Sequence, residues 1–265
     1  MSQILIKDVV DVLEEVFPPH YQEHYDNTGL QVGDVKSACS GVLLCVDVTC
    51  EIVAEAVAKG CNLIVTHHPL IFTPIKSVVP DDRVGGVIVS AIKEGVAIYS
   101  CHTSADNTPI NGVSWRMAEM LGLQNVSTLE PKNEEGVGSG VVGELRESLS
   151  REAFVSLVRE AFGSPVARCS SLTPDEGRIK VVALCGGAGG FLLPTAIDRG
   201  ADAFIASDCK HNQFIDNAKS IFLVDIGHFE SEECTKQIFY QIIRKKFPNF
   251  ALYCSEQEKN PIIYL

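Results

Sequence analysis

Histidines and acidic residues gather in four short stretches of this 265-residue chain. The stretches are "THHP" (66–69), "CHTSAD" (101–106), "SDCKH" (207–211) and "GHFESE" (227–232). Each one follows or ends an apolar run that is typical of a buried strand. Ligands bind at the carboxyl ends of the strands in open α/β sheets. We therefore expect these side chains to form a site.

The donor types in these stretches indicate a metal site. His102 and Asp106 share the spacing His-x-x-x-acid with His228 and Glu232. If a helix begins at residue 228, Glu232 lies one turn further along the same face. Imidazoles and carboxylates suit zinc, manganese, iron or nickel, and a carboxylate can also bridge two cations. Any one of these features is more often an ordinary polar group, but their shared placement at strand ends predicts metal binding.

Strands and helices must alternate along the chain to place these residues. The expected strands are 41–48, 61–66, 96–102, 180–185, 201–207 and 221–226. The expected helices are 7–17, 50–60, 83–94, 111–121, 150–162, 192–200, 211–219 and 230–246. This alternation predicts an α/β protein with parallel sheets covered on both faces. The polar, glycine-rich stretch 131–140 separates a first half (1–130) from a second (131–265), and the C-terminal helix could cross back to the first half.

The second half also repeats the first at a shift of 140 residues. "VLLC" (42–45) falls on "VALC" (182–185), and "AVAKGCNLIVT" (56–66) falls on "AIDRGADAFIA" (196–206). The following strand leads to a histidine in each half. Chance similarity between α/β units is the alternative explanation. The repeat favours two related α/β halves that face each other across a shared cleft.

Charge and hydropathy limit the classes of partner. The net charge is -12, whereas a general nucleic-acid binder needs clustered lysine and arginine, so direct nucleic-acid binding is not expected. The first residues carry acids too early for a signal peptide and have no cleavage-site pattern. No apolar run approaches the roughly 18 residues that span a membrane. We therefore expect a soluble, cytoplasmic protein.

The ten cysteines suit the same compartment. Several lie in or beside expected strands, including Cys45, Cys61, Cys101 and Cys185. A disulfide framework is typical of short secreted chains, and this chain is long. We expect reduced thiols that serve mainly as small apolar core residues.

The ordered set of motifs resembles the GTP cyclohydrolase 1 type 2 family, also called Nif-three-like (NGG-one-interacting-factor-three-like). The stretches that carry the resemblance extend over the whole chain: "YDNTGLQVGD" (25–34), "THHP" (66–69), "HTSAD" (102–106), "CGGAGG" (185–190), "GHFESE" (227–232) and "NPIIYL" (260–265). Tyr25 departs from the family pattern, which often has tryptophan there, but an aromatic residue is kept.

The resemblance implies a dinuclear metal site and an assembly. Its ligands would be His67, His68, Asp106, His228 and Glu232, with Glu232 as the bridging carboxylate. Two divalent transition-metal ions per chain would be bound, as zinc, iron, manganese or nickel. The chain resembles the short form of the family, without an inserted domain between the halves. Relatives of this kind form homohexamers, built as a trimer of dimers, with the metal sites facing an internal cavity.

The resemblance leaves two functions open. The first is a metal-dependent hydrolase that acts on cyclic C–N bonds of a nucleotide or purine-like small molecule. The second is a metal-binding scaffold or metal-handling, partner-binding protein without turnover. His102 could carry a proton or orient a ligand. The amides of Gly186, Gly187, Gly189 and Gly190 could hold a phosphate, or the stretch could be a plain turn.

The stretch "NTGLQVGD" (27–34) has no clear helix or strand pattern and is expected to be a loop. Its apolar residues Leu30 and Val32 are expected to be exposed. Such a loop could line the metal site or meet a neighbouring subunit. A loop packed on its own domain is the alternative.

Overall fold

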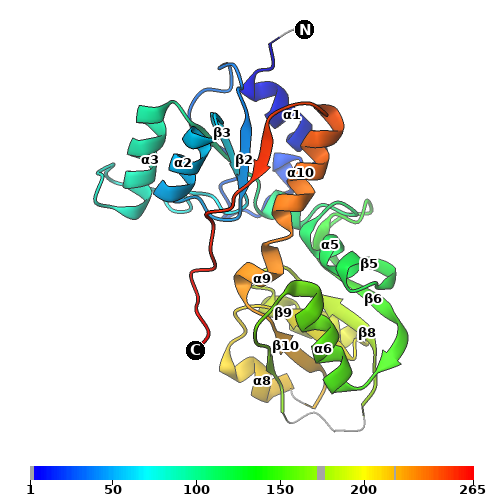
Figure 1. Cartoon of the computed structure of the whole chain (residues 1–265). Helices are drawn as coiled ribbons and strands as arrows, with labels where there is room; N and C mark the ends of the chain where they lie inside the picture. The colour runs from blue at the N-terminus through cyan, green and yellow to red at the C-terminus, as the bar shows by residue number, and fades with distance from the viewer. Residues whose placement is uncertain (1–2, 172–176, 218) are drawn as a thin grey trace. The chain divides into compact units, whose positions relative to one another are not determined.

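The computed structural model describes residues 3–171, 177–217 and 219–265. The chain forms two compact units (Figure 1). The first unit comprises the chain up to Ala105 together with Thr235–Pro261, and the second comprises Asp106–Cys234 with Ile262–Leu265. The sequence-based division at residue 130 follows the repeated sequence rather than the compact units, and it stays a prediction.

The first unit is built on a five-stranded sheet in the order β1-β4-β3-β2-β11. Strand β1 is antiparallel to β4, and the other neighbours are parallel. Every residue of β2, β3 and β4 is buried, as expected for parallel strands covered on both faces. The elements are α1 (Ile6–Val16), η1 (Pro19–Tyr21), β1 (Gly29–Val32), β2 (Val42–Cys45), α2 (Cys50–Ala58), β3 (Leu63–Thr66), α3 (Arg83–Glu94), β4 (Ala97–Ser100), α10 (Thr235–Lys246) and β11 (Leu252–Cys254).

Helices cover both faces of this sheet. Helices α2 and α3 lie on one face, and α1 and α10 lie on the other (Figure 1). The rings of Phe17 and Phe239 meet edge to face at 5.9 Å, so the C-terminal helix packs beside the N-terminal one. This is the crossing of the C-terminal helix that the sequence allowed for. In the core, Ile52 and Val87 from the helices pack with Leu43 from the sheet.

The second unit is built on a six-stranded sheet in the order β5-β6-β8-β9-β10-β7. Strands β8, β9 and β10 are parallel to one another. The antiparallel pairs are β5 with β6, β6 with β8, and β7 with β10. The elements are α5 (Val113–Met120), β5 (Gln124–Pro131), β6 (Gly138–Leu149), α6 (Arg151–Phe162), β7 (Arg168–Cys169), β8 (Ile179–Leu184), η2 (Gly190–Leu192), α7 (Leu193–Asp198), β9 (Ala203–Ala206), α8 (His211–Asn217), β10 (Phe222–Asp225) and α9 (His228–Glu232); the short helix α4 (Thr103–Asp106) passes from the first unit into the second.

Two local expectations were wrong. Residues 131–140 are not a simple connector, because they join β5 and β6 into an antiparallel hairpin that forms one side of the second sheet. Residues 29–32 form the edge strand β1 rather than a loop. Leu30 is exposed as expected, whereas Val32 is buried in the first core. Strand β1 is set by its pairing with the distant strand β4, which local sequence pattern does not show. The stretch 131–140 suits a hairpin turn as well as a connector, so its pattern alone does not decide between them.

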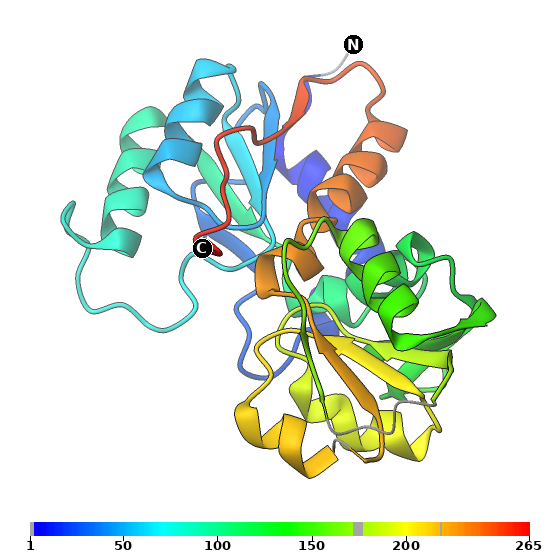
Figure 2. The same cartoon turned by 60° about the horizontal axis from the view of Figure 1, so that its bottom comes forward.

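The internal repeat is confirmed by the topology of the two sheets. Strands β2, β3 and β4 run parallel and side by side, and β8, β9 and β10 do the same. Strands β3 and β9 lie 140 residues apart, as the sequence shift predicts. An antiparallel edge strand follows in each sheet, β1 beside β4 and β7 beside β10. Figure 2 shows the parallel strands of the second unit in yellow and orange, with α6 in green on one side.

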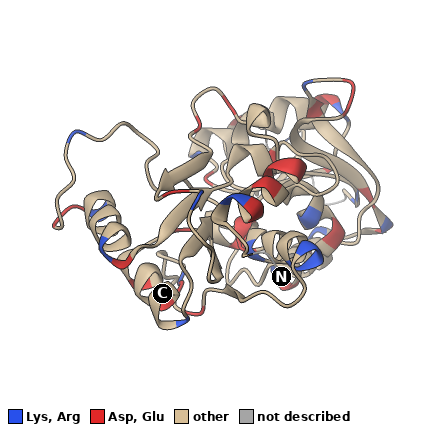
Figure 3. Ribbon diagram, turned by 90° about the horizontal axis from the view of Figure 1, so that it is seen from above, with Lys and Arg blue, Asp and Glu red and all other residues tan. Residues whose placement is uncertain are grey.

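The helices and charges of the described residues bear on the classes of partner. Among the residues that the structure describes, no helix has both the length and the apolar character that a membrane crossing requires. Lysines and arginines are spread over many elements, with acidic residues between them (Figure 3).

Candidate metal centre

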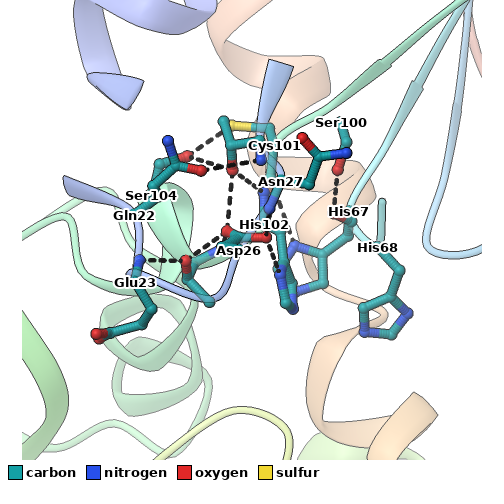
Figure 4. A network of polar contacts seen from close by, with 12 residues as sticks. Gln22, Glu23, Asp26, Asn27, His67, His68, Ser100, Cys101, His102 and Ser104 are labelled. Carbon is teal, nitrogen blue, oxygen red and sulfur yellow. Dashed lines mark hydrogen bonds and ion pairs between the residues drawn. The ribbon is translucent and has the colours of Figure 1, made fainter. Parts of the chain in front are cut away.

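Three histidines meet at one edge of the first sheet. His67 and His68 follow β3, and His102 follows the neighbouring strand β4. The strands are parallel, with Thr66 opposite Ser100, so both end at the same edge. One ring nitrogen from each imidazole lies within 4.8 Å of the others, close enough for one metal ion (Figure 4).

A hydrogen bond fixes the direction of each ring in the histidine pair. The Nδ1 atom of His67 lies 3.1 Å from the carbonyl oxygen of Cys101. The Nδ1 atom of His68 lies 3.0 Å from a carboxylate oxygen of Asp47. An oxygen at Nδ1 favours the tautomer with the proton there and leaves the lone pair on Nε2. Metal-ligating histidines usually have this arrangement.

His102 is held in the same way by a more deeply buried acid. Its Nδ1 atom lies 2.8 Å from Asp26, whose side chain is fully buried. Burial opposes ionisation of Asp26, but hydrogen bonds from His102, Thr103 and the backbone of Asn27 hold its pKa well below the ordinary value. Asp26 therefore stays a carboxylate and fixes the imidazole of His102.

The C-terminal segment holds the backbone of Asp47 in place. One oxygen of Glu258 accepts the backbone N–H groups of Val46 and Asp47, at 2.8 and 2.7 Å. Its other oxygen lies 3.2 Å from the ammonium of Lys236, and the two side chains are only 3% and 10% exposed. A residue more than 200 positions away in the chain thus holds the loop that orients His68.

The second unit brings an imidazole and a carboxylate together on α9. The Nε2 atom of His228 lies 3.0 Å from Glu232, one helical turn away, as the spacing predicts. The Nδ1 atom of His228 lies 2.7 Å from Asp208. Asp208 makes this contact from a left-handed backbone conformation, with φ 54°, which is uncommon for a residue other than glycine.

Asp106 lies in the same unit, at the end of α4. Burial raises the pKa of Cys234 to about 12, and the negative charges of Glu232 and Asp106 act in the same direction. The same two carboxylates add to the effect of burial on the pKa of Cys185, which is also well above its ordinary value. Asp106 and Glu232 therefore lie near the same two thiols.

The glycine-rich stretch after β8 makes room for Glu232. Gly187 has φ 63°, and a Cβ atom there would lie 2.2 Å from a carboxylate oxygen of Glu232. The N–H of Gly187 bonds to the Ser231 hydroxyl at 2.9 Å, and that of Gly186 to Ser114 at 3.3 Å. These amides already have acceptors, and a carboxylate lies beside them. These contacts at Gly186 and Gly187 favour the alternative of a plain turn, which packs on Glu232.

The structure groups the residues that the sequence pointed to as follows. His67 and His68 lie together in the first unit, and His228 and Glu232 lie together in the second, with Asp106 near the thiols that also neighbour Glu232. Sequence reasoning missed the acids that hold the imidazoles, which are Asp26, Asp47 and Asp208. A signal was present for two of them, since Asp26 and Asp208 fall in the stretches "YDNTGLQVGD" and "SDCKH".

Fold and donors define a class: a two-unit α/β protein with histidine and carboxylate groups at sheet edges. Residues 4–261 match the profile of the Duf34/NIF3 (NGG1p interacting factor 3) family, and the chain belongs to that family. It is 32% identical to a "GTP cyclohydrolase 1 type 2 homolog" of Clostridium perfringens, over 86% of each chain. A relative with the same name from Lactococcus lactis is 30% identical, over 97% of this chain and 98% of its own.

Solved structures support the fold. A Bacillus cereus protein related to NIF3 superposes with a TM-score of 0.93 at 23% identity, and the match covers both chains completely. A hypothetical protein of Staphylococcus aureus gives a TM-score of 0.91 at 26% identity, again over both complete chains. Reduced HcgD from Methanocaldococcus jannaschii gives 0.77 at 20% identity, over 97% of this chain and 99% of its own.

Proposed function

We propose that this protein binds two divalent transition-metal ions through His67, His68, Asp106, His228 and Glu232, and hydrolyses a small nucleotide or purine-like molecule. One observation carries the proposal. Each of the four imidazoles at the strand ends has an oxygen atom at Nδ1, three of them from carboxylates. An imidazole that serves only as a surface polar group does not need such support, whereas a metal ligand does.

The donor set fits zinc, iron, manganese or nickel. The first unit supplies imidazole nitrogens, and the second supplies two carboxylates and one imidazole. No thiol is needed, and burial keeps the nearest thiols protonated. Glu232 is 3% exposed, and a buried carboxylate needs positive partners. We assign Glu232 as the bridging ligand.

The chemistry follows from these positions. Bound divalent cations would supply the Lewis acidity that makes water nucleophilic near neutral pH and that polarises the attacked group. Asp47, Asp26 and Asp208 orient the imidazoles of His68, His102 and His228 through their Nδ1 atoms. We assign His102 as the proton carrier, because Asp26 holds its ring in place beside His67 and His68.

The names of relatives support the substrate class. Curated relatives at about 30% identity are called GTP cyclohydrolase 1 type 2 homologs. A reaction of this type opens a ring by hydrolysis of cyclic C–N bonds. To test it, metal-loaded and metal-stripped protein are compared on nucleotides, phosphoesters and cyclic amides. We expect metal-dependent turnover of a nucleotide. No turnover of any class by fully loaded protein would contradict it.

The alternative is a metal-handling or partner-binding protein without turnover. The family description, an interacting factor of NGG1p, records partner binding and favours this second function. The two functions separate in the same screen, because a scaffold keeps its metal and shows no turnover.

We also propose the homohexamer, a trimer of dimers, that the family resemblance implies. The edge strand β1 presents Leu30 at 38% exposure, and an exposed strand edge is a ready site for contact with another copy. Light scattering should give a mass near six times the 28.7 kDa of the chain. A monomer mass would contradict the assembly and would leave the metal site untouched.

A further inference from the structure

Two exposed aromatic rings lie beside the histidine group of the first unit. Tyr25 and Phe72 are 54% and 47% exposed, and their ring centroids are 6.3 Å apart. Phe72 lies 6.0 Å from the ring of His102 in an edge-on arrangement. Tyr25 precedes Asp26, which holds His102, and Phe72 lies four residues after His68. The two rings thus come from the two loops that carry the site.

Side-chain amides lock these two loops together. The Asn27 amide donates to the carbonyl oxygen of Ile71 at 2.7 Å. The N–H of Ile71 donates to the Gln31 side chain at 3.2 Å. Gln31 in turn donates to the carbonyl oxygen of Asn27 at 2.7 Å. The backbone next to both rings is therefore held in place before any ligand binds, which lowers the entropy cost of binding.

Aromatic rings in such positions have a specific use. An exposed ring face stacks on another planar ring, and this preference does not depend on the hydrogen-bonding pattern of the ligand. A pair of neighbouring rings, one of which contacts a candidate proton carrier, is suited to hold a flat substrate next to the reacting group. A sugar or a simple phosphoester has no flat ring to stack.

We propose that Tyr25 and Phe72 form an aromatic shelf on which the planar heteroaromatic ring of the substrate stacks, next to His102. This inference rests on the proposed function and deepens it, because it names the residues that select a base-containing substrate. It also assigns Tyr25 and Phe72 as specificity-determining residues, separate from the metal ligands.

The test uses metal-loaded protein of measured metal content and isothermal titration calorimetry. Guanosine is the probe with a planar ring, and ribose 5-phosphate is the ring-free control. The variants Tyr25→Leu and Phe72→Leu keep apolar bulk and remove the ring. Tyr25→Phe keeps the ring. Tyr253→Leu removes an exposed aromatic ring from β11, at the opposite edge of the same sheet.

We expect guanosine to bind the parent and ribose 5-phosphate to bind much more weakly. Each leucine variant at the shelf should weaken guanosine binding by roughly 5- to 100-fold, the range typical of one stacked base. Tyr25→Phe and Tyr253→Leu should keep the parental affinity, and all variants should keep the parental metal content.

Three results would overturn the shelf. Guanosine could fail to bind fully metal-loaded protein, or it could bind both leucine variants as tightly as the parent. The leucine variants could instead lower the mass in light scattering along with guanosine affinity, which would show that the rings pack between copies of the chain. A parent protein that does not keep its metal would contradict the proposed metal centre and not the shelf. The measured metal content therefore distinguishes failure of the metal centre from failure of the shelf.

Discussion

The two units share one strand frame but use it differently. In the first unit, His67 and His68 follow the middle parallel strand β3. At the matching positions of the second unit, Ser207 and Asp208 follow β9. Asp208 holds the ring of His228 there. The two units therefore carry polar side chains at the same strand end, but these side chains have different roles in each unit.

A second exchange occurs after the first parallel strand of each unit. Asp47 follows β2 and holds His68, whereas Gly187 lies at the matching position after β8. There the missing side chain leaves space for Glu232. In the first unit, the carboxylate of Asp47 orients the imidazole of His68. In the second unit, the absence of a side chain at Gly187 leaves room for the carboxylate of Glu232.

The largest effect is expected from closing that space. Gly187→Ala would place a methyl group 2.2 Å from Glu232 and force the carboxylate to move. We expect the metal content to fall to about half or less. Gly200→Ala is the matched control, because Gly200 has a similar φ, 70°, with no neighbour within 4 Å. Both variants carry a backbone cost of about 1–2 kcal/mol, so melting temperatures should fall alike. Parental metal content in Gly187→Ala would contradict the role of this glycine.

The acids that hold the imidazoles should have similar effects in both units. Asp47→Ala and Asp208→Ala each remove the oxygen at one Nδ1 atom. We expect each to weaken metal binding by about 10- to 100-fold, as is typical when the support of a ligating histidine is lost. Competition with a coloured chelator measures this affinity. If only one variant weakens binding, the parallel between the two units fails.

A smaller effect is expected at Glu258, which acts on His68 only through the backbone of Asp47. Glu258→Gln keeps an acceptor for the two N–H groups but removes the charge beside Lys236. We expect a loss of roughly 1–3 kcal/mol in the free energy of unfolding and a few-fold loss in metal affinity.

Glu55→Gln is the matched control for Glu258→Gln. Glu55 holds the same C-terminal segment from helix α2, through Ser255 and the N–H of Glu256, whereas Glu258 bonds to the backbone of Asp47 itself. Glu55→Gln should lower the free energy of unfolding and leave metal affinity unchanged. Denaturant titration measures the free energy of unfolding, and chelator titration measures the metal affinity. Equal losses of metal affinity in both variants would show that the C-terminal segment acts only on overall stability.

The sequence predicts the repeated core of this fold well. Buried runs such as "LIVT" carry their own strand signal, and the shift of 140 residues predicts which strands correspond. It does not predict β1, because this strand is defined by its pairing with the distant strand β4. It does not predict the β5–β6 hairpin either, because a polar, glycine-rich stretch suits a plain connector as well as a hairpin turn. Histidines and Glu232 stood out by type and spacing. The acids that hold the imidazoles could not be paired with their histidines from spacing, because Asp26, for example, contacts His102 across 76 residues.

The most direct test of the central claim is the metal content of the purified protein after repletion with zinc or manganese. Elemental analysis should give two ions per chain for the parent. It should give clearly less for His67→Ala, in the first unit, and for Glu232→Ala, in the second. Almost no metal in the repleted parent, or an undiminished content in both variants, would contradict a dinuclear centre built from both units.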